Sequence, residues 1–218
     1  MELLQDIHNG LERPRKEKLL LISGRYDYYH YMVDGTEDIG WGCGYRTLQT
    51  MCSWIKLSTT CPKINESVPS LRRIQEILVE AGDKPTSFVN SRDWIGSCEV
   101  FLVLDVLFDV PCKIVHLEPG RFTRGETGFL VDHFMKFKSP VMMGGDVDGA
   151  SKCIIGISYC SKETPDNMML LILDPHFSGS QPTKCQLQKN GWVSWQRLSN
   201  FCNDSFYNFC LPQISSSN

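Results

Sequence analysis

A cysteine between two glycines is the residue of this sequence best suited to do chemistry. Cys43 lies in the segment Gly40–Arg46 and, alone among the ten cysteines, has a glycine on both sides. The thiolate is the nucleophilic form of cysteine, and the unpaired N–H groups at the start of a helix lower the pKa of a thiol. The flanking glycines would let a substrate backbone approach closely. The segment predicts an exposed nucleophile of depressed pKa at the first turn of a helix.

A cysteine nucleophile needs an imidazole base, and one tripeptide supplies both the base and its partner. Asp174-Pro175-His176 ends the apolar run 168–173. Residues two apart on a strand project from the same face, so Asp174 and His176 can meet, and the carboxylate would fix the imidazole tautomer. Because so short a motif recurs by chance, a plain strand-ending turn stays the alternative.

The other histidines, cysteines and acidic residues do not form a second site in the sequence. None of the other four histidines has a carboxylate two positions away at the end of a strong strand, so structural or surface roles are expected for them: His8, His30, His116 and His133. No Cys-x-x-Cys pair is present, and Asp146 and Asp148 lack the remaining ligands of a Ca²⁺ loop. We predict no metal and no cofactor, and a strand-connecting turn at 144–149.

Helices are expected in the first half of the chain and strands mainly in the second. Apolar spacing predicts a helix over 43–55 that lays one stripe on the core. Further helices are expected at 69–81, 98–108 and 129–137, and strands at 19–22, 113–117, 140–143, 153–159 and 168–173, with 26–31 as a strand or an aromatic-lined loop. This order is typical of an α+β fold with a largely antiparallel sheet.

Length and composition favour one globular domain over residues 1–218. The lead-in 1–18 and the tail 213–218 are expected to be flexible. With 22 basic and 25 acidic residues, the net charge of −3 provides no broad positive field for nucleic acid or an anionic membrane. No signal peptide and no membrane-spanning run is recognised. Cys52, Cys98 and Cys153 lie in apolar periodic segments and are predicted to be reduced hydrophobes, which indicates the cytosol or nucleus. A monomer is expected.

Several blocks of sequence resemble the cysteine proteases specific for the ubiquitin-fold modifier. The blocks occur in the same order and span roughly residues 19–212: 34–49, 82–85, 91–96, 140–145 and 174–176. The chain is similar to the short form of that family, which consists of the catalytic domain alone.

The resemblance implies a papain-like fold and a role for each of four residues. Cys43 would be the nucleophile, His176 the base, Asp174 its orienting partner and Tyr31 the donor to the oxyanion. The sequence alone does not choose Tyr31 from Tyr26, Tyr28 and Tyr29.

The implied activity is cleavage after the C-terminal glycine of the modifier, both to mature its precursor and to release it from target proteins. Trp41 and Trp94 would narrow the cleft so that only glycine threads it, with ordinary core tryptophans as the alternative. Two other functions stay open: a protease for the lipid-conjugated autophagy modifiers, and a catalytically idle module that only binds the modifier.

Overall fold

The computed structural model describes residues 3–15, 18–60, 67–123, 125–160 and 168–217. Helices and strands follow one another in this order: β1 (Lys18–Leu21), α1 (Cys43–Ser58), α2 (Leu71–Glu80), α3 (Ser97–Phe108), β2 (Cys112–Leu117), α4 (Gly128–Lys136), β3 (Val141–Gly145), β4 (Ser151–Tyr159), β5 (Met169–Leu173), α5 (Lys184–Lys189), β6 (Val193–Arg197) and β7 (Tyr207–Pro212). Two short 3₁₀ turns cover Thr86–Phe88 and Leu198–Asn200. The predicted α+β class is confirmed.

The strands form one antiparallel sheet in the order β2-β7-β3-β4-β5-β6. One edge of β4 is shared: its first half pairs with β3 and its second half with β1. Gly156 permits this, because a Cβ there would lie 3.0 Å from the Leu20 carbonyl oxygen and closer still to Leu21. Strand β4 is therefore held on both edges along its length.

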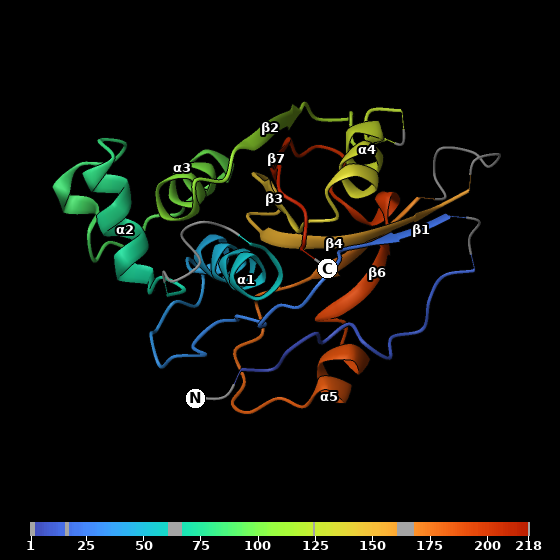
Figure 1. The fold of residues 1–218 in the computed structure, drawn as a ribbon, viewed down its shortest axis with the longest axis horizontal. Coiled ribbons are helices and arrows are strands. Elements are labelled where there is room, and N and C mark those ends of the chain that lie inside the picture. The colour runs from blue at the N-terminus through green and yellow to red at the C-terminus, as the bar shows by residue number, and fades with distance from the viewer. Residues whose placement is uncertain (1–2, 16–17, 61–66, 124, 161–167, 218) are drawn as a thin grey trace.

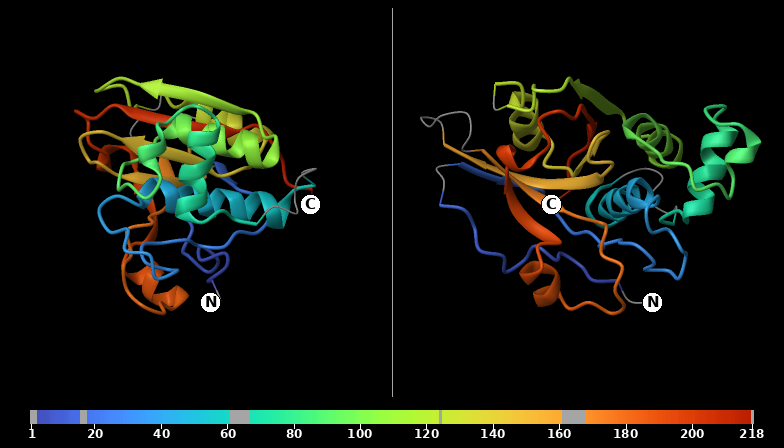
Figure 2. Two further views of the ribbon diagram at one scale, coloured as in Figure 1. Left: turned by 90° about the vertical axis from the view of Figure 1, so that its left-hand side faces the viewer. Right: turned by 180° about the vertical axis from the view of Figure 1, so that it is seen from behind.

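Helices cover both faces of the middle of the sheet. Strand β4 is buried at almost every position rather than at alternate ones, which is typical of a strand with packing on both faces. Helix α1 packs on β3 and β4, and α4 packs on β1 and β4 (Figure 1). The side and rear views show α2 and α3 beyond α1, away from α5 (Figure 2).

Helix α1 is buried around nearly its whole circumference, which corrects the single apolar stripe predicted from its spacing. Its polar side chains are buried with partners: Ser53 Oγ donates to the Thr50 carbonyl at 2.7 Å, and Gln49 Nε2 donates to the Pro69 carbonyl at 2.8 Å. Trp54 Nε1 donates to the Ser23 carbonyl at 2.8 Å. Hydrogen-bonded polar groups can be buried at little net cost, so periodicity underestimates the burial of such a helix.

Other predicted elements were found with shifted ends, and three were not predicted. Helix α2 begins at Leu71, where the side chain of Ser70 accepts a hydrogen bond from the Arg73 N–H at 3.1 Å. Residues 26–31 form the loop rather than the strand, with one isolated bridge between Gln5 and Asp27. The short elements α5, β6 and β7 had no prediction.

Part of the N-terminal lead-in packs on the fold. Ile7 is fully buried, the Asp6 N–H donates to the Tyr26 carbonyl at 3.1 Å, and Gln188 Nε2 donates to the Ile7 carbonyl at 2.7 Å. Residues 1–2, 16–17 and 218 lie outside the described residues. The flexibility expected for 1–18 and 213–218 stays a prediction. None of the helices among the described residues is long and apolar enough to cross a membrane.

Candidate active site

Three separate segments bring the predicted catalytic residues together. Cys43 is the first residue of α1, as the sequence predicted. Asp174 and His176 follow β5, and the loop before α1 carries Tyr31, whose N–H donates to the Pro175 carbonyl at 3.0 Å. This backbone bond ties the Tyr31 loop directly to the Asp-Pro-His segment.

Asp174 orients His176 as the sequence predicted. Asp174 Oδ1 accepts from His176 Nδ1 at 2.5 Å and from the His176 backbone N–H at 3.0 Å. Lys152 Nζ lies 3.6 Å from Asp174 Oδ2, and Tyr28 donates its hydroxyl proton to the Asp174 carbonyl. Burial raises the pKa of Asp174, but the hydrogen bond to His176 and the positive charges of His176 and Lys152 lower it by more. The net pKa is below the usual value of an aspartate, so the carboxyl stays ionised.

The surroundings of Cys43 favour a thiolate. Burial raises the pKa of the thiol, but hydrogen bonds with His176, the Ser151 backbone N–H and the Tyr31 hydroxyl bring it below its usual value. Burial likewise lowers the pKa of His176, but Asp174 and Cys43 raise it to about 9. The lowered pKa of the thiol and the raised pKa of the imidazole together favour a thiolate–imidazolium pair, which is the reactive form of a cysteine nucleophile.

Tyr31 lies where its hydroxyl can serve the reaction. Its ring packs edge-on against the His176 ring, with 5.2 Å between centroids, and its hydroxyl bonds to Cys43. Burial is the main reason that the pKa of the Tyr31 phenol is raised, and the neighbouring Cys43 raises it further. Tyr31 therefore keeps its proton and can act as a donor beside the thiolate.

One detail of the Cys43 prediction is wrong. Cys43 is not exposed: only 6% of its surface is accessible, and its thiol lies against His176, Tyr31 and the Ser151 backbone. The flanking glycines also make room for the protein itself, since a Cβ on Gly42 would clash with the Asp38 side chain and one on Gly44 would lie 2.6 Å from the Ile95 carbonyl oxygen. That they let a substrate backbone approach closely stays a prediction.

A buried ionic cluster, not predicted from the sequence, ties the Tyr31 loop to α1. Arg46 is fully buried; its Nε donates to Asp38 Oδ2 at 2.7 Å and its Nη2 to Asp34 Oδ1 at 2.8 Å. Asp38 Oδ1 accepts from the Met32 N–H at 2.7 Å, and Met32 has the left-handed φ of +58°. Since Met32 follows Tyr31 and Arg46 follows Cys43 by one turn, the cluster positions both residues.

Cys43 lines a cavity of about 290 Å³, and so do Trp41 and Trp94, the two tryptophans predicted to narrow the cleft. Its other lining residues include glycines from three segments, Gly44, Gly96, Gly144, Gly145 and Gly149. Trp94 is 57% exposed, and its Nε1 donates to the Gly40 carbonyl at 3.2 Å. A Cβ on Gly149 would lie 3.2 Å from the Trp94 ring, so the ring and this loop face each other closely. Trp94 is therefore not a core tryptophan.

The remaining histidines lie outside this cluster and have other partners. His8 Nδ1 is 2.9 Å from the Tyr26 hydroxyl, His116 bonds to Asn208, and His133 Nε2 is 3.0 Å from Ser139 Oγ. His30 is not part of the triad: its Nδ1 lies 2.8 Å from the Tyr31 carbonyl oxygen and 3.1 Å from that of Phe177.

The turn predicted at 144–149 is largely found, and one cysteine prediction is wrong. Asp146 accepts from Ser205 Oγ and the Phe206 N–H within the β3–β4 connection. Cys52 and Cys153 are buried, but Cys98 is exposed, because it lies in the first turn of α3. Within the described ranges, no three histidine, cysteine or acidic side chains are grouped to hold a metal ion.

The family model of Peptidase family C78 matches residues 17–210 and thus includes all four clustered residues. The chain belongs to Peptidase family C78. The resemblance drawn from the sequence blocks is thereby confirmed, and the enzyme is a cysteine peptidase.

Relatives within the C78 family agree with this assignment. The chain is 44% identical over 217 residues to the Ufm1-specific protease 1 of Mus musculus, covering 98% of this chain and 95% of that protein. It is 40% identical over 212 residues to the Ufm1-specific protease 2 of Homo sapiens, of which it covers 44%. Near-complete coverage of the first agrees with the predicted short form.

A solved structure supports the predicted papain-like fold. The crystal structure of UfSP from C. elegans superposes with a TM-score of 0.81 at 32% identity, covering 99% of this chain and 38% of that one. The helical part and the antiparallel sheet are thus a fold already seen in a protein of similar sequence.

Proposed function

We propose that this C78 peptidase cleaves after the C-terminal glycine of Ufm1, maturing the Ufm1 precursor and releasing Ufm1 from lysine side chains of target proteins. The observation that carries the proposal is the contact of Cys43 with both His176 and Tyr31, in a chain 44% identical to a Ufm1-specific protease. An oriented thiolate–imidazolium pair beside a neutral phenol is the arrangement that acyl transfer to cysteine requires.

In the proposed acylation step, Cys43 Sγ attacks the carbonyl carbon of the terminal glycine. The carbonyl electron pair moves to oxygen, and the Tyr31 hydroxyl and the Cys43 backbone N–H donate to that oxyanion. When the intermediate collapses, the C–N bond breaks and His176 gives its proton to the departing nitrogen. The glycyl thioester remains on Cys43.

In deacylation, water attacks the thioester and His176 takes its proton. The C–S bond breaks, the modifier leaves with a free carboxyl group, and the thiolate–imidazolium pair is restored. Asp174 keeps the same His176 nitrogen facing Cys43 in both half-reactions.

Specificity for glycine follows from the cavity at Cys43. The Trp94 ring packs directly against Gly149, and both line the cavity at Cys43, so the ring narrows that cavity from one side. A substrate residue with a Cβ would have to displace the ring, whereas glycine would not.

The direct test compares cleavage of three substrates: a C-terminally extended Ufm1, a Ufm1–lysine isopeptide, and an extended autophagy modifier. The proposal expects release from both Ufm1 substrates, no release from the third, and none at all with Cys43→Ala. Preference for the autophagy modifier would favour the alternative protease of the same fold. Tight binding of Ufm1 without cleavage would favour the idle binding module.

We further propose that the protein acts as a monomer in the cytosol or nucleus, with no role in nucleic-acid binding or membrane insertion. The described cysteines, nine in number, are all free thiols, as expected in a reducing compartment. Gel filtration and localisation of a tagged chain would test these points.

A further inference from the structure

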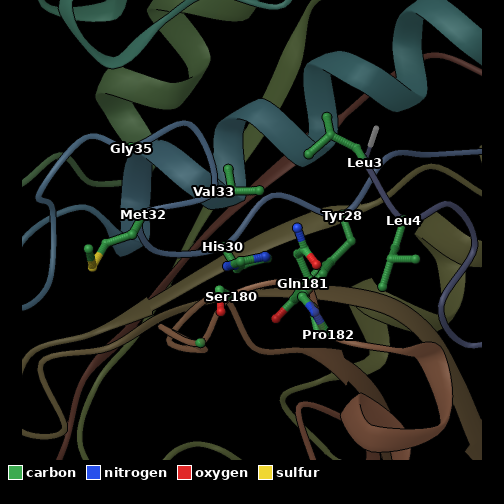
Figure 3. A pocket seen from close by; sticks show the side chains of 11 residues that line it. Leu3, Leu4, Tyr28, His30, Met32, Val33, Gly35, Ser180, Gln181 and Pro182 are labelled. Carbon is green, nitrogen blue, oxygen red and sulfur yellow. The ribbon is translucent and has the colours of Figure 1, made fainter. Parts of the chain in front are cut away.

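A second cavity is lined by both neighbours of Tyr31 in the sequence, His30 and Met32, and among the described residues it shares no lining residue with the cavity at Cys43. Its volume is about 610 Å³, roughly twice that of the cavity at Cys43, and it does not include Cys43. Two segments form most of its wall: the loop 28–35, which carries Tyr31, and the loop 179–182, which follows His176. Figure 3 shows His30 and Gln181 between these loops, with Leu4 and Met32 on opposite sides.

Hydrogen bonds tie the wall of this cavity to the segments that carry the catalytic residues. His30 lines it and reaches the carbonyls of Tyr31 and Phe177 through Nδ1, at 2.8 and 3.1 Å. Tyr28 lines it too and bonds to the Asp174 carbonyl. Each of the two side chains thus contacts a residue of the triad or its direct neighbour.

The chemistry of acylation fixes which part of the substrate lies on this side. His176 must give its proton to the departing nitrogen, so that nitrogen and the chain attached to it lie on the His176 side of Cys43. The segment that follows His176 leads directly into the wall of the second cavity. The modifier's glycine, by contrast, enters the cavity at Cys43.

The lining identifies the chemistry of the occupant. Five of the described lining residues are apolar side chains, namely Leu3, Leu4, Met32, Val33 and Pro182, and the described lining includes one titratable imidazole, His30, but no aspartate, glutamate, lysine or arginine. Burial lowers the pKa of His30, so its ring is neutral at pH 7. An uncharged, apolar peptide segment fits such a wall, whereas a charged one would lose hydration without gaining a partner.

We propose that this cavity is a leaving-group subsite, which binds apolar side chains in the residues that follow the scissile glycine of a precursor. The inference rests on the proposed function, because it needs a modifier tail in the cavity at Cys43. It adds a second determinant of substrate choice: the enzyme selects what departs as well as what is acylated.

The test uses Ufm1 fusions that differ only in the residues after the scissile glycine. One tail carries two leucines, one two aspartates and one two lysines, each followed by the same reporter domain. A Ufm1 methyl ester, whose leaving group is methanol, provides the reference, and each kcat/KM is divided by that of the ester. The wild type is expected to favour the leucine tail over the aspartate tail by about tenfold, as burial of part of one leucine side chain supports.

Gln181 offers a charge test with little risk to the fold, because its side chain is exposed at the cavity. Gln181→Lys should raise the relative rate of the aspartate tail and lower that of the lysine tail, and Gln181→Glu should do the opposite, each by about threefold or more. Gln196→Glu on β6, which does not line the cavity, is the matched control and should leave the ratios unchanged.

Three other results would overturn the proposal. Equal cleavage of all tails by every variant would refute the subsite alone and leave the proposed function intact. An equal effect of the Gln181 charge on all fusions and on binding of mature Ufm1 would place the body of the modifier in the cavity. Cleavage of no fusion by the wild type would refute the proposed function and the subsite together.

Discussion

At the residue scale, Tyr31 is the part of the site whose role is easiest to isolate. Tyr31→Phe removes one donor to the oxyanion and keeps the ring that packs on His176. Loss of one such donor lowers kcat by about 100- to 1000-fold, or roughly 3 to 4 kcal/mol in the transition state. We expect this loss in steady-state kinetics with KM nearly unchanged. A raised KM at unchanged kcat would make Tyr31 a substrate contact instead.

The ion pair at Cys43 predicts the pH dependence of the reaction. The pair exists between the pKa of Cys43, which is lowered, and that of His176, which is raised to about 9. Activity should therefore rise with pH as Cys43 ionises, at a pH below the ordinary pKa of a thiol, and fall as pH rises through about 9, where the imidazolium loses its proton.

Asp174→Asn tests the origin of that alkaline limb. The amide cannot stabilise the imidazolium as a carboxylate does, so the limb in kcat/KM should move to lower pH and the maximum should fall. His176→Ala and Cys43→Ala should abolish turnover, and their double variant should be scarcely worse, since the two act as one unit. An alkaline limb that Asp174→Asn leaves in place would show that Asp174 does not set the pKa of His176.

Trp94 predicts how strictly glycine is required. The wild type should cleave a modifier ending in alanine more slowly than one ending in glycine, by about 10- to 200-fold for a single added methyl group. Trp94→Ala widens the cavity beside Gly149 and should reduce this discrimination, whereas Trp94→Phe should retain most of it. Discrimination unchanged in Trp94→Ala would assign the glycine preference to another part of the cleft.

At the scale of elements, the connection between the Tyr31 loop and α1 depends on a buried charge. The two carboxylate oxygens of Asp38 accept from the Met32 N–H and from Arg46 Nε, so the single amide oxygen of Asp38→Asn can serve only one of these donors. The guanidinium also loses the charge of Asp38 and keeps Asp34 and the neutral Gln49. Breaking a buried pair costs about 3 kcal/mol or more. In a chain of this size that lowers Tm by roughly 6 to 12 °C.

The same variant should affect catalysis through Tyr31. Because Asp38 also holds the Met32 N–H, we expect kcat to fall more than KM rises. Asp34→Asn is the matched control, since the Asp34 side chain is 39% exposed and its loss should cost less in both Tm and kcat. Equal effects of the two substitutions would show that Asp38 does not position the loop.

The elements also show what the sequence could and could not predict. The start of α1 at Cys43 and the pairing of Asp174 with His176 follow from local rules: glycine before a periodic helix, and residues two apart at a strand end. The Arg46 cluster could not be predicted in this way, because the partners of a buried arginine are set by tertiary packing. Tyr31 was identified by family resemblance only, since three nearby tyrosines, Tyr26, Tyr28 and Tyr29, share its local sequence character.

Strands β6 and β7 carried weaker signals. The buried residues of β7 include Tyr207, Phe209 and Leu211, in partial alternation, but Cys210 and Pro212 are buried as well, so side chains on both faces of this inner strand are covered. A central strand buried on both faces loses the period of two that identifies a strand in sequence.

At the scale of the whole molecule, Cys43 at the start of α1 lines a cleft together with β3, the β3–β4 connection and the start of α3. The central claim is that Cys43 in this cleft is a nucleophile for the modifier's terminal glycine. A Ufm1 probe whose C-terminal glycine carries a vinyl electrophile measures this most directly. Cys98 and Cys185 are exposed thiols and provide an internal control for nonspecific reaction.

The wild type should form a single covalent adduct with the probe, and peptide mass spectrometry should locate it on Cys43. Cys43→Ala should form none while still binding mature Ufm1, and an equivalent ubiquitin probe should not react. An adduct on Cys98 or Cys185 with Cys43 unmodified, or equal capture of the ubiquitin probe, would contradict the account.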